Sequence, residues 1–200
     1  MKGSLLLLAC FVLGILAGYS GWVPEAITEE DKLALYALYV LIFLVGICVG
    51  GDTRALRNIL RLKARGLAVP LVAGLGSLLG AGALALGLEA VSFREGCAVG
   101  AGFGYYSLAS VLASQLGGAQ LGGITLLANI LREVLTISLT PLMARSMGNL
   151  APIACGGATT MDTTLAVIHR QVGSSYAVIA VINGLVLSLL VPVLIPLLLG

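Results

Sequence analysis

Charged side chains are scarce in this 200-residue sequence: only 10% of the residues are Asp, Glu, Lys or Arg, and 59% are hydrophobic. A soluble globular domain carries about 25% charged residues. Together with a mean hydropathy of +1.09, this composition excludes a soluble domain of this size. It predicts an all-α polytopic membrane protein, because a helix satisfies its own backbone hydrogen bonds within lipid.

Cysteine is also scarce, and its spacing excludes the usual metal sites. The cysteines stand singly in apolar stretches, without a C-x-x-C or Cys/His pattern. We therefore expect no bound metal and no organic cofactor, and we expect the cysteines to be small buried residues. They are Cys10, Cys48, Cys97 and Cys155.

Motifs for catalysis and for nucleotide binding are missing as well. The glycine-rich run that begins at Gly100 lacks the G-K-[ST] ending of a phosphate loop. Ser107 and His169 are the candidate pair for an intramembrane hydrolase, but no G-x-S-x-G surrounds the serine and the histidine falls near the inner interface. The sequence therefore favours neither an enzyme nor a nucleic-acid-binding protein.

Long apolar stretches are what the sequence does contain. A bilayer crossing takes about 20 apolar residues, and the first stretch counts as a span because no A-x-A cleavage site follows it. We expect one integral membrane domain over residues 1–200 with about five transmembrane helices. The predicted spans are residues 5–22, 33–50, 67–88, 121–143 and 176–199.

The distribution of positive charge predicts the orientation of these spans. Five of the eleven Lys and Arg residues lie in the loop of residues 51–66, and positively charged loops face the cytoplasm. The amino terminus is then cytoplasmic, while the acidic stretch 24–32, residues 89–95 and the carboxyl terminus are external.

Two further stretches, residues 96–118 and 152–171, are too rich in small and polar residues for ordinary lipid-facing helices. Such segments are tolerated at membrane depth only where they are buried in protein or line a cavity. We expect two oppositely directed broken or re-entrant helical segments, which suggest an inverted repeat although no residue-by-residue repeat is visible. If both segments cross fully, the chain has seven spans and Arg145 changes side; the positive-inside rule favours the hairpins.

An arginine and a glutamate, Arg132 and Glu133, lie inside the fourth predicted span. Charges in spans cost about 2.5–3.5 kcal/mol each on insertion scales and mark functional sites by default. The residues that share a helical face with Glu133 are Thr125, Asn129, Thr136 and Thr140. This polar stripe predicts a substrate route, whereas Arg132 points about 100° away and is also explained as the partner of a carboxylate on another segment.

The candidate binding residues come from these three polar segments. Asp162 is also explained as the N-cap of a helix beginning at Thr163, and Ser107 as a small residue that aids helix packing. A capping role does not exclude a binding role, because a half-helix end inside a membrane is itself an ion site. The candidate substrate- or ion-binding residues are Glu133, Asp162, Arg132, Asn129, Ser107, Tyr106, Thr159, Thr160, Thr163 and Gly104.

Three runs of the sequence resemble the carboxy-terminal part of the bacterial lysine exporter family. They are G-A-G-F-G-Y-Y-S-L-A-S from Gly100, L-L-A-N-I-L-R-E-V-L-T from Leu126 and C-G-G-A-T-T-M-D-T-T-L from Cys155. The resemblance extends from about residue 5 to the end of the chain. It implies export of L-lysine, and of analogues such as thialysine, across the bacterial inner membrane, and it matches the family's intramembrane glutamate to Glu133.

The chain departs from the single-chain members of this family in one respect. Those members carry a further amino-terminal membrane region with another intramembrane acid, and this chain begins near the junction. The resemblance therefore implies one half of a split transporter, completed by a small separately encoded membrane protein or by a second copy in a homodimer, or a truncated chain.

The chemistry of lysine suits these residues. Its ammonium groups need carboxylates, for which Glu133 and Asp162 are candidates, and its carboxylate needs a helix N-terminus or a cation such as Arg132. Export of a cation opposes an inside-negative potential by about 2.3 kcal/mol per 100 mV, so a coupling ion is required. We expect proton antiport with Glu133 as the carrier, and Na⁺ is the alternative coupling ion.

Two other function classes stay open. The same architecture suits a transporter of Na⁺, of another amino acid or of an organic anion. A non-transporting membrane subunit of a larger complex would instead use the polar stripe as an interface, and would bind no amino acid.

Overall fold

The computed structural model describes residues 64–200 and six single positions of the preceding part of the chain. The chain divides into two compact units, Met1–Leu44 and Val45–Gly200, and the architecture below is that of the second unit. Apart from these six positions, the predicted spans 5–22 and 33–50 lie outside the described residues, as does the part of the basic loop before Ala64. The six single positions, all helical with exposed side chains, are Leu13, Leu16, Tyr19, Tyr36, Val40 and Phe43.

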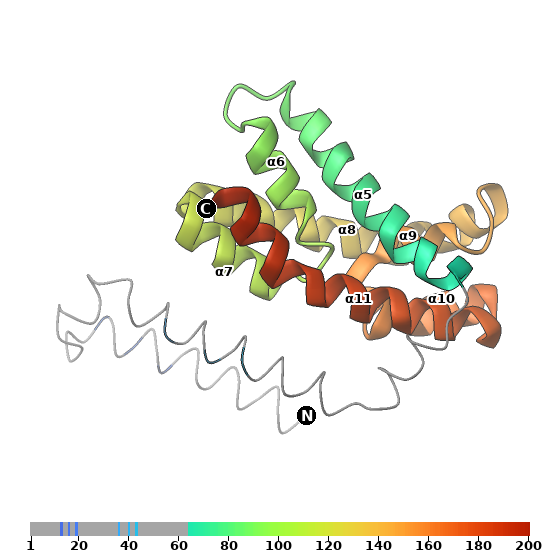
Figure 1. The fold of residues 1–200 in the computed structure, drawn as a ribbon. Coiled ribbons are helices and arrows are strands. Elements are labelled where there is room, and N and C mark those ends of the chain that lie inside the picture. Colours follow the sequence, from blue (N-terminus) through green and yellow to red (C-terminus); the bar gives the residue numbers. More distant parts are fainter. Residues whose placement is uncertain are drawn as a thin grey trace. The chain divides into compact units, whose positions relative to one another are not determined.

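Every regular element of residues 64–200 is a helix (Figure 1), which confirms the all-α class that the composition predicts. The number of spans in the whole chain stays a prediction. The elements are α5 (Ala64–Ala85), α6 (Phe93–Gly100), α7 (Tyr106–Gly117), α8 (Ala119–Ser146), α9 (Ala151–Gly156), the 3₁₀ helix η1 (Gly157–Met161), α10 (Leu165–Val172) and α11 (Ser174–Leu199).

Three of these helices are long and apolar enough to cross a membrane. The stretches that meet this condition are Ala68–Ala85 in α5, Ala119–Ser146 in α8 and Tyr176–Leu199 in α11. They overlap the predicted spans 67–88, 121–143 and 176–199. In Figure 1 these helices run in alternating directions along the chain. Each leaves large apolar side chains exposed, such as Leu71, Leu127 and Val193, as a face in contact with lipid would.

Two interrupted segments connect the long helices. Residues 101–105 separate α6 from α7, and η1 with residues 162–164 separates α9 from α10. No arm exceeds 12 residues, or about 18 Å of helix, whereas a hydrocarbon core is about 30 Å thick. A single arm therefore cannot cross a membrane. In Figure 1 the α6–α7 segment and the α9–α10 segment lie toward opposite ends of the unit, with their breaks between them.

The order of elements repeats along the chain. Gly118 ends α7 with φ +89°, and Gly173 ends α10 with the same φ, a backbone conformation that glycine adopts without steric cost. The stretches 64–118 and 119–173 therefore share the same order of long helix, two short arms and glycine. Because α5 and α8 run in opposite directions (Figure 1), the two stretches are arranged as an inverted pair.

The two breaks touch at the centre of the unit. The amide of Ala158 donates to the carbonyl oxygen of Phe103 across 2.8 Å. Phe103 is completely buried with φ +50°, and Gly157 has φ +62°. A β-carbon on Gly157 would collide with the same Phe103 carbonyl oxygen, so glycine is what allows the second break to approach the first.

The other ends of the short arms are fixed by local contacts. Ser92 caps α6 by accepting from the amide of Glu95, while the Glu95 carboxylate accepts from the amide of Ser92 across 2.7 Å. Hydrogen bonds from the side chain and backbone of Ser92 hold the pKa of Glu95 below its usual range. At the opposite end, a buried cluster of Ile153, Ile168 and Ala180 packs α9, α10 and α11 together.

Candidate functional site

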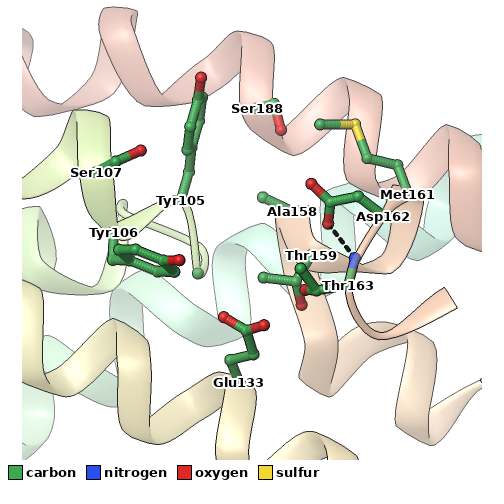
Figure 2. Close-up of a pocket in the computed structure, with 11 residues that line it drawn as sticks. Tyr105, Tyr106, Ser107, Glu133, Ala158, Thr159, Met161, Asp162, Thr163 and Ser188 are labelled. Carbon is green, nitrogen blue, oxygen red and sulfur yellow. Dashed lines mark hydrogen bonds between the residues drawn. The ribbon is translucent and has the colours of Figure 1, made fainter. Parts of the chain in front are cut away.

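A cavity of about 180 Å³ lies beside the contact between the two breaks. Its walls come from the start of α7, the middle of α8, η1 with the residues that follow it, and α11 (Figure 2). The lining residues are Gly104, Tyr105, Tyr106, Ser107, Glu133, Ala158, Thr159, Met161, Asp162, Thr163 and Ser188.

Two carboxylates enter this cavity from different walls. Glu133 projects from α8, and Asp162 projects from the segment after η1 (Figure 2). Glu133 is partly buried and Asp162 is exposed. None of the residues that line the cavity is Lys, Arg or His, so the cavity carries an excess of negative charge. Its electrostatics favour a cation.

The start of α7 supplies a complementary feature on another wall. Tyr105, Tyr106 and Ser107 occupy the N-cap and the first two positions of this helix, and all three line the cavity. No side chain caps the helix. Unpaired amides and the helix dipole make such an end favourable for a negative group. The cavity therefore combines two anionic side chains with one backbone site for an anion.

The structure brings together most of the candidate residues chosen from the sequence. Their role in binding stays a prediction. Those that line the cavity are Glu133, Asp162, Ser107, Tyr106, Thr159, Thr163 and Gly104.

Asn129 does not line the cavity but braces the first break. Its amide oxygen accepts from the amide of Gly104 across 2.7 Å, and its amide nitrogen donates to the carbonyl oxygens of Val99 and Thr125. The side chain is 3% exposed. Both of its polar atoms are thus engaged by the backbone that shapes the cavity wall.

Arg132 braces the second break in the same way. Its Nε and Nη2 donate to the carbonyl oxygens of Cys155 and Ala154, across 2.7 and 3.3 Å, and its Nη1 donates to Ser77 on α5 across 2.6 Å. These carbonyls belong to the last turn of α9, where the helix dipole favours a cation. Within residues 64–200 no carboxylate pairs with Arg132, so the predicted carboxylate partner is not found there.

Thr160 is the third candidate that lies away from the cavity. It is completely buried, and its hydroxyl group donates to the carbonyl oxygens of Gly157 and Ala180. Asn183 on α11 donates to the same hydroxyl oxygen and to the carbonyl of Gly157. These contacts attach the second break to α11.

The interpretation of Asp162 as a helix N-cap is wrong. The helix begins at Leu165 with Thr164 as its N-cap, because η1 and the non-helical backbone of residue 162, with φ −136° and ψ −90°, delay the α-helix. Asp162 instead accepts from the amide of Thr163 across 2.6 Å, and its carboxylate remains directed into the cavity (Figure 2).

Four lining residues were not among the candidates: Tyr105, Ala158, Met161 and Ser188. The first three are direct chain neighbours of chosen residues. Ser188, like Asn183 and Gly184, is a small or polar residue within the very apolar last span. Polar groups in a span are a functional signal in their own right, and this signal could have identified α11 as a wall of the site.

The cysteines in the described part are not part of this cavity. Cys97 is buried and Cys155 is partly buried, and the hydroxyl of Thr136 donates to the Cys155 sulfur across 3.3 Å. Among the described residues, no group of three His, Cys, Asp or Glu side chains could hold a metal ion.

Comparison with known proteins decides the family. The family model described as "Lysine exporter LysO" matches residues 8–199, nearly the whole chain. The chain belongs to the lysine exporter family. This membership confirms the resemblance carried by the three sequence runs. With the three membrane-length helices, it identifies the chain as a membrane protein of a transporter family rather than an enzyme family. No solved structure matches the chain.

Two relatives in the lysine exporter family differ in how much of them the chain covers. "Lysine exporter LysO" of Escherichia coli is 35% identical over 193 residues, which are 96% of this chain but 62% of that protein. "Putative lysine exporter" of Haemophilus influenzae is 33% identical over 189 residues, 94% of this chain and 94% of that protein. The chain thus spans less than two thirds of the first relative and nearly all of the second.

Proposed function

We propose that this chain forms all or part of a secondary active transporter that exports L-lysine across the bacterial inner membrane. The observation that carries the proposal is the cavity between the two helix breaks, with two carboxylates and no basic side chain in its lining. The names of both relatives point to the same cargo. Thialysine, which has the same charged groups as lysine, would be a second cargo.

The charges of lysine match the charges of the cavity one by one. At neutral pH lysine carries two ammonium groups and one carboxylate. Glu133 and Asp162 each bind one ammonium group through charge-assisted hydrogen bonds. The unpaired amides at the start of α7 bind the carboxylate. A zwitterionic amino acid without a second ammonium would leave one of the two carboxylates unpaired, which is unfavourable inside a membrane.

Export also needs a driving ion. Moving a cation outward costs about 2.3 kcal/mol per 100 mV of inside-negative potential. Exchange of lysine for protons, with Glu133 as the proton carrier, would supply that free energy from the proton gradient. Na⁺ entering the same acidic cavity is the alternative coupling ion. The amino terminus is cytoplasmic and the carboxyl terminus external in this proposal.

The complete pathway requires more than this 200-residue chain if the Escherichia coli relative, with its additional length, is the working form. A second copy of this chain or a small separately encoded membrane protein would then complete the transporter. The Haemophilus influenzae relative, of which the chain covers 94%, is consistent with a working form of about this length.

The test is counterflow of labelled lysine into liposomes that contain the purified full chain and unlabelled lysine. We expect uptake by the wild type, at least about tenfold slower uptake by Glu133→Ala, because a charge-assisted hydrogen bond contributes about 1.5–3 kcal/mol, and normal uptake by Glu89→Gln. Glu89 is the matched control because it is an exposed acid outside the cavity.

The outcomes separate the parts of the proposal. Uptake that appears only after a second membrane protein is added to the liposomes supports the split transporter. Glu133→Gln that still drives lysine efflux from a pH gradient at the wild-type rate rules out Glu133 as the proton carrier. Exchange of Na⁺ or of a neutral amino acid, with no exchange of lysine, contradicts the cargo.

A further inference from the structure

Ser188 is a buried hydroxyl group without a partner. It lies on α11, is 4% exposed, and its Oγ forms no hydrogen bond within the described part of the chain. It also lines the cavity between the two helix breaks. Burial of a polar atom without a hydrogen-bond partner is unfavourable, so a hydroxyl at this position calls for an explanation.

Other hydroxyl groups on the long helices donate a hydrogen bond to their own helix backbone, which Ser188 does not. The hydroxyls of Thr125, Thr136, Thr140 and Ser146 on α8 each donate to the carbonyl oxygen four residues earlier, across 2.6–2.8 Å. Ser and Thr hydroxyl groups within a helix commonly donate this hydrogen bond. Ser188 makes no such bond, and its hydroxyl remains free for a group inside the cavity.

The backbone at Ser188 is also short of a partner. Residue 192 of α11 is proline, which has no amide hydrogen to donate to the carbonyl four residues earlier. The carbonyl oxygen of Ser188 therefore lacks its regular helical donor. One residue in the middle of a membrane-length helix thus offers a hydroxyl oxygen and a carbonyl oxygen as acceptors.

The surroundings of Ser188 determine which group suits these acceptors. In Figure 2 Ser188 and Asp162 lie on the same side of the cavity, while Glu133 and Tyr106 enter from the other side. An ammonium group has three N–H donors and no acceptor. The Asp162 carboxylate and the Ser188 carbonyl oxygen only accept hydrogen bonds, and the Ser188 hydroxyl can accept them. These groups are therefore complementary to a primary ammonium.

We infer that Ser188 and Asp162 together bind the side-chain ammonium of a diamino acid, with the Ser188 hydroxyl oxygen accepting one of its N–H bonds. This inference rests on the proposed lysine transport. The α-ammonium then pairs with Glu133 and the α-carboxylate meets the start of α7. The separation between the two sides of the cavity selects the length of the side chain, so Ser188 is a specificity-determining residue.

The test compares lysine with Nε-trimethyl-lysine, which keeps the positive charge but has no N–H to donate from its side chain. Dissociation constants are measured for the purified full chain in lipid nanodiscs, with Na⁺ and with Na⁺ replaced by choline. The variants are Ser188→Ala, Ser188→Thr, which restores a hydroxyl, and Thr140→Val. Thr140 is the matched control because its buried hydroxyl is bonded to Thr136 and does not line the cavity.

We expect Ser188→Ala to weaken lysine binding about tenfold or more, since 1.4 kcal/mol corresponds to tenfold and a hydrogen bond to a charged group contributes at least that much. Binding of Nε-trimethyl-lysine should change less than about twofold, Ser188→Thr should recover most of the affinity for lysine, and Thr140→Val should bind as the wild type. Loss of discrimination between lysine and its shorter homologue ornithine should accompany Ser188→Ala.

Other results overturn the inference in distinguishable ways. Equal losses for lysine and Nε-trimethyl-lysine in Ser188→Ala would mean that Ser188 acts on the shape of the cavity. Ser188→Ala could leave the lysine affinity in choline buffer unchanged but abolish the difference in affinity between Na⁺ and choline buffers. That result would assign Ser188 to a sodium site. A wild type that binds no lysine removes the proposed function and this inference together, whereas wild-type binding that Ser188→Ala leaves unchanged removes only the inference.

Discussion

At the scale of single residues, the polar positions of α8 divide into two groups. Asn129 and Arg132 are engaged by the backbone of the two breaks, and Glu133 enters the cavity. Adjacent residues on a helix point about 100° apart, so the neighbours Arg132 and Glu133 face different parts of the protein. One helix therefore both braces the breaks and contributes a charge to the cavity between them.

The first prediction concerns Arg132. Replacing it with Ala should lower the free energy of unfolding by about 2–4 kcal/mol, because hydrogen bonds to a charged group contribute about 1.5–3 kcal/mol each and the carbonyls of Ala154 and Cys155 lose their donor. Thermal unfolding of the purified protein, followed by circular dichroism, would measure this change. Arg145→Ala, at an exposed position in the last turn of α8, should unfold as the wild type.

A different result would identify Arg132 as a substrate-binding residue. If Arg132→Ala unfolds at the wild-type temperature but binds lysine more weakly, the guanidinium acts on the lysine carboxylate and the bracing role is wrong. Arg132→Lys should lie between the wild type and Arg132→Ala, because a single ammonium cannot reproduce the planar fork of three bonded nitrogens.

The sequence predicted the charged residues better than their roles. Glu133 and Asp162 were recognisable because carboxylates are rare in apolar stretches. The role of Arg132 was not, since its partners are backbone carbonyls more than 20 positions away along the chain and a residue in α5. Backbone acceptors are present at every residue, and no sequence pattern indicates which of them a side chain will meet.

At the scale of elements, composition located the interruptions but not their geometry. The small and polar residues of 96–118 and 152–171 predicted broken segments, and both contain breaks. The start of α10 was placed too early because η1 intervenes. A 3₁₀ turn differs from an α-helical turn by a shift in hydrogen bonding, which here depends on contacts with Phe103 and α11 rather than on local propensity.

The second prediction concerns Gly157, at the contact between the two helix breaks. Gly157→Ala should prevent the two breaks from meeting, because the new β-carbon would collide with the Phe103 carbonyl oxygen and the backbone has φ +62°. We expect lysine counterflow to fall below detection and the yield of folded protein to drop. Gly123→Ala on α8 is the control: within residues 64–200 no atom lies within 4 Å of the added β-carbon, and alanine favours a helix over glycine by about 1 kcal/mol.

Size-exclusion chromatography of both variants separates folding from function. A folded Gly157→Ala protein with normal counterflow would mean that the contact between Ala158 and Phe103 is not needed in the transport cycle. A Gly123→Ala protein that loses activity would instead indicate that the face of α8 bearing Gly123 meets another chain or an earlier part of this one, because nothing in residues 64–200 occupies that space.

At the scale of the whole molecule, class and family followed from the sequence because they depend on composition and on ordered motifs. Neither requires knowledge of contacts between distant residues. The opposed polar segments suggested an inverted repeat, but its bounds did not follow, since residues 64–118 and 119–173 share an order of elements and not a residue pattern. A long helix followed by two short arms can be built from many apolar sequences, so the bounds of the repeat are visible in the backbone only.

The last prediction decides between five and seven spans. If α6–α7 and α9–α10 are re-entrant, α8 ends in the cytoplasm, and a cysteine at Ser146 should be protected from a membrane-impermeant maleimide in intact cells and react in inverted vesicles. If both segments cross fully, the same cysteine should react in intact cells. Ser146 suits the test because it is exposed at the last position of α8.

Two further positions calibrate that experiment, because both topologies place them on the same sides. A cysteine at Glu89 should react from outside, and one at His169 should react only in inverted vesicles; both residues are exposed. The background is a chain in which alanine replaces Cys10, Cys48, Cys97 and Cys155. Protection of Ser146→Cys with labelling of Glu89→Cys would place the two breaks at membrane depth from opposite faces. The cavity that contains Glu133 and Asp162 would then lie where alternate access from the two sides is possible.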